Sequence, residues 1–137
     1  MSSSSVTLAG ILLLALVTVE SGGYFLTKVV RGRVPANALQ TGFFRAGHAH
    51  AAVLLVLGLA ILGVIDQTHL TGFWMWVGRT AVPIAAILMP AGFFLSVIGR
   101  DPQKPSRLIA LLWVGVVVLT VGLVTAGVGL IIAGASS

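Results

Sequence analysis

The chain has 137 residues, of which 58% are hydrophobic and only 8% are charged, and its mean hydropathy is +1.11. In soluble domains roughly a quarter of the residues are charged, so this composition excludes a soluble protein and predicts an integral membrane protein. The absence of cysteine excludes disulfides, thiolate metal sites and a cysteine nucleophile. We ascribe the net charge of +5 to orientation in the membrane, and we expect no nucleic-acid partner.

Four apolar runs are each long enough to cross a bilayer, which takes about 20 residues. Short polar connections separate the runs and favour antiparallel neighbours. We therefore predict an all-α, single-domain membrane protein that forms an up-down-up-down four-helix bundle. The predicted spans are residues 6–30, 41–65, 73–98 and 108–133.

The first predicted span contains an acidic residue, Glu20, with Tyr24 one turn further along. A charged side chain at the centre of a bilayer costs roughly 2.5 to 3.5 kcal/mol, so Glu20 is expected to be paired or protonated. Its predicted partners are Arg45, His48 and His50. A structural ion pair and a proton-handling role are the two alternatives for Glu20.

The second span opens on FFRAGHAH, residues 43–50, which contains two of the three histidines of the chain. Helical residues two positions apart point about 200° apart, so His48 and His50 are expected to face different sides and not to share an ion. Arg45 precedes His48 by three residues and shares its face. Alanine and glycine leave space beside both rings, which suits a neighbouring helix or a flat ligand.

The third span opens on an aromatic cluster, FWMW, that is typical of a membrane interface. Pro83 and Pro90 each remove a helical hydrogen bond, and we expect a bend near Pro90 to widen a pocket at the level of the histidines. Arg79 is predicted to lie near the opposite membrane surface, within reach of Asp66.

The fourth span carries no charge and is rich in glycine. Small residues let helices approach closely in lipid, so this helix is expected to pack closely within the chain or to form an oligomer contact. Its glycines include Gly115, Gly122, Gly127 and Gly129.

Basic residues flank the first and third loops, whereas the second loop has none. The positive-inside rule therefore predicts that loops one and three are cytoplasmic and that both termini face outward, in a multi-pass protein of the plasma membrane. The six basic residues are Lys28, Arg31, Arg33, Arg100, Lys104 and Arg107.

Several of the polar side chains are predicted to lie at a similar depth. With a rise of about 1.5 Å per residue, Glu20 is roughly 15 Å and the two histidines are roughly 10 to 13 Å from the cytoplasmic ends of their spans. Tyr24 and Met89 fall within the same layer. We therefore predict a polar and aromatic layer in the cytoplasmic half of the bundle.

FFRAGHAH resembles a motif of a small membrane family that includes styrene oxide isomerase and hydroxylaminobenzene mutase: an aromatic residue, an arginine, a small residue and a histidine. The similarity in span number and length extends loosely over most of the chain. The resemblance implies a trimer that binds haem b through this histidine between subunits, with the ferric iron as a Lewis acid. The family's Asn-Gly pair is absent, since the chain continues AAVLLVLG. Either His48 or His50 matches the family histidine.

The leading hypothesis is therefore a homo-oligomer, a trimer or dimer, that binds haem b through His48 or His50 with Arg45 near a propionate. In isomerase-like Lewis-acid chemistry, Glu20 or Tyr24 would donate or accept a proton.

Three other possibilities remain open. Electron transfer would use Met89, or a histidine of a neighbour, as the second axial ligand. A non-catalytic accessory or assembly subunit of a larger membrane complex would dock through its glycine-rich fourth helix. A proton-coupled conductance would use Glu20 and the histidines.

Overall fold

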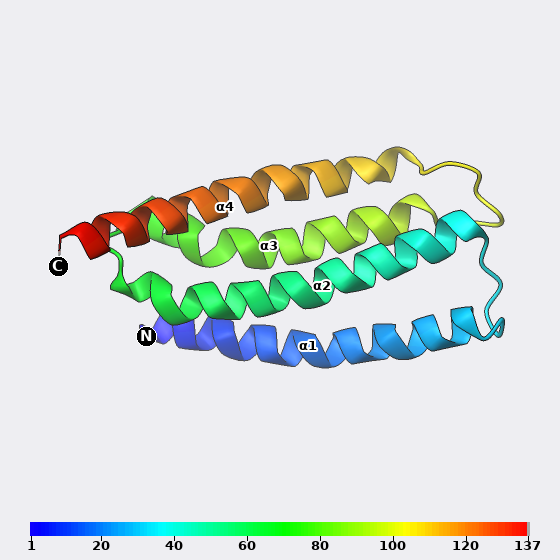
Figure 1. Cartoon of the computed structure of the whole chain (residues 1–137), viewed down its shortest axis with the longest axis horizontal. Coiled ribbons are helices and arrows are strands. Elements are labelled where there is room, and N and C mark those ends of the chain that lie inside the picture. The colour runs from blue at the N-terminus through cyan, green and yellow to red at the C-terminus, as the bar shows by residue number, and fades with distance from the viewer. Residues whose placement is uncertain (137) are drawn as a thin grey trace.

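Four long helices follow one another in antiparallel order in the computed structural model, which describes residues 1–136 (Figure 1). All four are long and apolar enough to cross a membrane. The all-α fold class is confirmed, and no strand forms within the described residues. The elements are α1 (Ser3–Val30), α2 (Ala38–Val64), the short turn η1 (Ile65–Gln67), α3 (Gly72–Ser96), the short turn η2 (Arg107–Ile109) and α4 (Ala110–Ala135).

α1 and α2 each begin three residues before the predicted span because a polar side chain caps the helix. The Ser2 hydroxyl accepts a hydrogen bond from the backbone N–H of Ser5 at 3.2 Å. Before α2, the Asn37 side chain accepts from the backbone of Gln40 at 2.8 Å, and the Gln40 side chain accepts from the backbone of Asn37 at 3.1 Å. Such reciprocal caps satisfy N–H groups that have no partner inside the helix.

The two ends of the molecule differ in character. α1 begins and α4 ends at one end, together with the loop that follows η1, and we call this the terminal end (Figure 1). The loops at residues 31–37 and 97–106 lie at the opposite end, which we call the basic end. Three basic residues flank or lie in each of these two loops.

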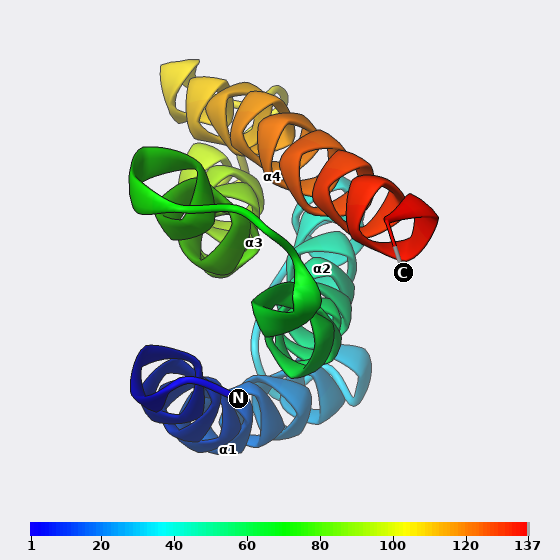
Figure 2. The same cartoon turned by 90° about the vertical axis from the view of Figure 1, so that its left-hand side faces the viewer.

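The helices form an open arrangement rather than a closed square. α3 packs against both α2 and α4, whereas α1 packs mainly against α2 (Figure 2). The buried core accordingly lies around α2 and α3, where Leu62, Val82 and Ala85 are fully enclosed. One long side of α1 is left without a helix to cover it.

Two glycines of α4 make room for α3, and a third makes room for the loop before α3. A Cβ atom added to Gly115 would lie 2.5 Å from Cγ of Met89, and one added to Gly122 would lie 2.5 Å from Cβ of Ala81. Gly129 similarly faces the side chain of Leu70. These three glycines therefore pack within the chain, as the first of the two sequence alternatives predicts.

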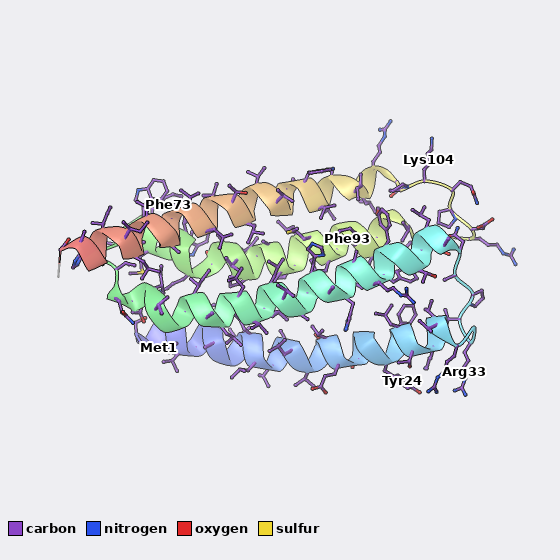
Figure 3. The ribbon with its side chains drawn as sticks, viewed as in Figure 1. Met1, Tyr24, Arg33, Phe73, Phe93 and Lys104 are labelled. Atoms are coloured by element: carbon purple, nitrogen blue, oxygen red, sulfur yellow. The ribbon has the colours of Figure 1, made fainter. Side chains whose placement is uncertain are left out.

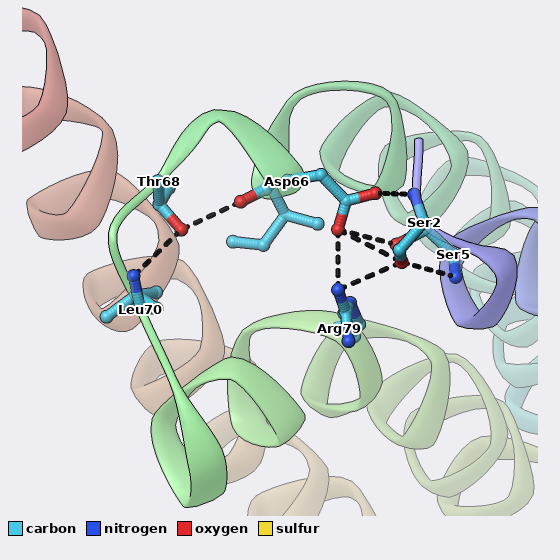
Figure 4. Close-up of polar contacts among 7 residues, drawn as sticks. Ser2, Ser5, Asp66, Thr68, Leu70 and Arg79 are labelled. Atoms are coloured by element: carbon cyan, nitrogen blue, oxygen red, sulfur yellow. Dashed lines mark hydrogen bonds and ion pairs between the residues drawn. The ribbon is translucent and has the colours of Figure 1, made fainter.

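A polar cluster joins three helices at the terminal end (Figure 4). The carboxylate of Asp66 accepts hydrogen bonds from the guanidinium of Arg79 at 2.6 Å and from the hydroxyl of Ser5 at 3.0 Å. It also accepts from the backbone N–H of Ser2. Arg79 lies within reach of Asp66, as predicted, and the two form an ion pair that joins α3 to η1. The hydrogen bonds with Ser2 and Ser5 connect this pair to the start of α1.

Candidate functional site

Five phenylalanine rings connect α1, α2 and α3 towards the basic end, and we call them the aromatic layer. Phe25 of α1 meets Phe44 of α2 with ring centroids 5.5 Å apart, and Phe44 stacks on Phe94 of α3 at 5.8 Å. Phe43 meets Phe93 at 5.6 Å. Sequence analysis did not single out Phe25, Phe93 or Phe94. The repeated triplet GFF, which occurs in both α2 and α3, could have indicated paired phenylalanine rings on these two helices.

His50 lies beside this layer on the side of α2 that faces α3. Its ring centroid is 5.0 Å from that of Phe93, which lies between the two helices in Figure 3. The Nδ1 atom is 2.8 Å from the backbone oxygen of Ala46. Because a carbonyl oxygen only accepts, Nδ1 carries the hydrogen, and in the neutral ring Nε2 carries the lone pair.

His48 faces α1 instead. A Cβ atom added to Gly22 would lie 3.2 Å from Nδ1 of His48, and one added to Gly23 would lie 3.6 Å from its Nε2. The ring thus fills a notch that two successive glycines leave in α1. The predicted divergence of His48 and His50 is confirmed, and within residues 1–136 no three histidine, aspartate or glutamate side chains group so as to hold a metal ion.

The unbonded nitrogens of both histidines are not completely buried, and both side chains are half-buried. Among the described residues, the only fully buried side-chain nitrogen or oxygen atom without a partner is Nε of Arg79. No hydrogen bond to Nε2 of His50, or to either ring nitrogen of His48, occurs in residues 1–136, so these atoms are not fully enclosed. His50 therefore lies on an open flank of α2, next to Phe93, rather than in a sealed cavity.

Glu20 and Tyr24 lie on the side of α1 that faces away from the other helices. Tyr24 is 63% exposed and points outward (Figure 3), with the ammonium group of Lys28 4.4 Å from its ring centroid. Glu20 is also exposed. Within residues 1–136 no hydrogen bond or ion pair joins Glu20 to another side chain, so the expected pairing with Arg45 or a histidine is wrong for a single chain. The reason is that α1 turns its glycines, not Glu20, towards α2.

Met89 and Arg45 also lie apart from His50. Met89 is buried against Gly115 of α4, so it is not directed towards the histidine. Arg45 is exposed on the outer side of α2, near the basic end.

Pro83 and Pro90 both lie inside α3, which continues through them. A hollow of about 810 Å³ lies at the basic end and is lined by Pro35, Ala36, Asn37, Gln40, Gly99, Arg100 and Asp101.

Comparison of the chain with protein-family models, with curated proteins and with solved structures finds no match. The similarity to the isomerase and mutase family therefore rests on FFRAGHAH and the four spans alone.

Proposed function

We propose that this chain is a multi-pass plasma-membrane protein that binds haem b, with His50 as the axial ligand. The hydrogen bond from Nδ1 of His50 to the Ala46 carbonyl, 2.8 Å long, is the observation that carries the proposal. Histidines that bind metals usually donate the other ring N–H to a carbonyl or carboxylate, which fixes the ring and directs the lone pair of the ligating nitrogen. In His50 this arrangement leaves Nε2 unbonded and accessible.

The surroundings of His50 suit a flat, largely apolar group. Phe93 supplies an aromatic ring on one side. The small side chains of Ala46 and Ala49 leave space beside His50 on the surface of α2. Arg45 lies five residues nearer the basic end, about 140° around α2 from His50, and its exposed guanidinium is long enough to meet a propionate at that end. By contrast, both ring nitrogens of His48 lie over the glycines of α1. These differences favour His50 over His48 as the ligand.

The position of Met89 bears on the choice of chemistry. A haem with a single protein ligand supplies a Lewis-acidic iron with an open axial position, whereas two protein ligands are typical of electron transfer. Met89 faces α4, and the chain offers no second histidine on the side of His50. This supports isomerase-like Lewis-acid activity over electron transfer.

The accessory-subunit alternative receives less support from the glycines of α4. It predicted docking through the glycines of α4, but Gly115, Gly122 and Gly129 pack within the chain. Of the four glycines, Gly127 alone has no atom within 4 Å of an added Cβ. We therefore retain haem binding as the proposed function.

The visible absorption spectrum of the purified protein tests this proposal. We expect a Soret band in the detergent-solubilised protein, or its appearance when haemin is added to the colourless form. Carbon monoxide should shift the band of the reduced protein, because one axial position is open. A folded preparation that develops no Soret band with haemin would overturn the proposal.

A further inference from the structure

The outward position of Glu20 needs a physical explanation. α1 is apolar enough to span a membrane, and Glu20 lies well within it and is exposed. One long side of α1 has no other helix against it (Figure 2). Acidic side chains in such segments almost always face protein or a water-filled cavity rather than lipid. Leu13, Val17, Glu20 and Tyr24 are all exposed, and their intervals of four, three and four residues place them on one stripe of the helix. We call these four residues the α1 stripe.

The α1 stripe has a counterpart at the same depth on α2. His48 lies opposite Gly22, and Gly58 lies opposite Leu12, so positions along the two antiparallel helices are matched in reverse order. His50 follows His48 by two residues, so it lies level with the residue two positions before Gly22 on α1, which is Glu20. By the same reckoning, Arg45 lies at the level of Tyr24 to within one residue, and Val53 at the level of Val17.

The outer flank of α2 is shaped to receive a helix. Arg45 and His50 border a strip of surface formed by Ala46, Ala49 and Val53, in which Ala49 and Val53 are exposed. Small residues such as these allow close approach of a second helix in lipid. Within one chain this flank and the α1 stripe cannot meet, because the glycine face of α1 is already packed against the opposite flank of α2.

We infer that the α1 stripe of one copy of this chain packs against the outer flank of α2 in a second copy, so that Glu20 reaches His50 and Tyr24 reaches Arg45. Copies inserted the same way in one membrane are related by a rotation about the membrane normal, which preserves the depth of every residue. The matched levels, and the placing of the acidic Glu20 opposite a flank that carries His50 and Arg45, identify the second copy as the occupant.

The contact gives Glu20 the partner that it lacks in a single chain. When Nε2 of His50 is free, the carboxyl group of Glu20 and the imidazole can form a hydrogen bond across the contact. Haem bound at Nε2, which rests on the proposed function, would take the place of Glu20 at that nitrogen. The contact is therefore one of the haem-free chain, and haem ligation would exclude it.

Cross-linking in the membrane tests this inference without requiring haem. The natural chain has no cysteine, so single cysteines can be introduced at Val17 and Val53, which are exposed apolar positions at one level. We expect a covalent dimer when Val17→Cys and Val53→Cys are co-expressed and treated with a short bismaleimide. Neither variant alone should form it. The matched control pairs Val17→Cys with Val117→Cys, an exposed position on α4, and should give no dimer.

A second comparison tests the role of Glu20 in this contact. Glu20→Leu should abolish the cross-link between the cysteines at positions 17 and 53. Thr18→Leu, an equally apolar change at an exposed position outside the stripe, should retain it. The inference is overturned if Val17→Cys alone dimerises, if the mixed pair gives no product, or if Glu20→Leu has no effect. A cross-link in a protein that never develops a Soret band would refute haem binding and leave the contact standing.

Discussion

His48 and His50 are separated by one residue, yet they face opposite flanks of α2: His48 lies over Gly22 of α1, and His50 lies against Phe93 of α3. Their roles are therefore separable. The first connects two helices of one chain, and the second presents a nitrogen to an open surface.

The notch beneath His48 leads to a prediction about Gly22. Gly22→Leu should lower the free energy of unfolding by about 1 to 3 kcal/mol, which is typical of overpacking, because even a Cβ there lies 3.2 Å from the imidazole. Gly10→Leu is the matched control, since an added Cβ at Gly10 has no atom within 4 Å. Denaturant unfolding in detergent measures both. Equal stability of the two variants would show that His48 does not fill this notch.

Removing the carboxylate at the terminal end should loosen the start of α1. Asp66→Ala leaves the largely buried guanidinium of Arg79 without its 2.6 Å partner, and hydrogen bonds to charged groups contribute about 1.5 to 3 kcal/mol. We expect a loss of stability of that size in thermal unfolding. The double variant Asp66→Ala with Arg79→Met should recover part of it, because no unpaired charge remains. No recovery in the double variant would argue against the ion pair as the source.

Arg45 should strengthen haem binding without being essential to it. Arg45→Ala is expected to weaken the affinity roughly fivefold or less, since an exposed charge contact contributes little, and Arg45→Lys should restore most of the loss. Titration of the haem-free protein with haemin, followed at the Soret band, measures the change. Arg33→Ala, at an exposed position in the first loop, should have no effect. A complete loss of binding in Arg45→Ala would instead indicate a direct role at the iron.

The basic residues at one end of the molecule predict how the chain is oriented in the membrane. We expect a reporter fused after Lys104 to be active in the cytoplasm, because the positive-inside rule retains the flanking arginines there. A reporter inserted at His69, in the loop that has no lysine or arginine, should be active on the outer side. The reverse pattern would invert the topology.

Much of the fold could be predicted from the sequence because the constraints are local. The apolar runs end close to the observed helix ends, and the opposite facing of His48 and His50 follows from helical periodicity. The earlier starts of α1 and α2 depend on the capping geometry of Ser2 and Asn37.

The relations between helices could not be predicted in the same way. Depth places Glu20, His50 and Met89 in one layer, but depth says nothing about direction. Which face α1 turns towards α2 depends on how the His48 ring fits against Gly22 and Gly23, a tertiary contact with no separate signal in the sequence. Met89 likewise turns to α4 because Gly115 makes room for it.

Comparison of the Soret bands of His50→Ala and His48→Ala tests the proposed site most directly. Both proteins would be purified in parallel with His69→Ala, in which an exposed loop histidine is changed, and titrated with haemin. We expect the band to disappear in His50→Ala and to persist in His48→Ala and His69→Ala. A band that survives in His50→Ala while His48→Ala loses it would contradict the assignment of His50, and a band in all three would contradict ligation by either histidine.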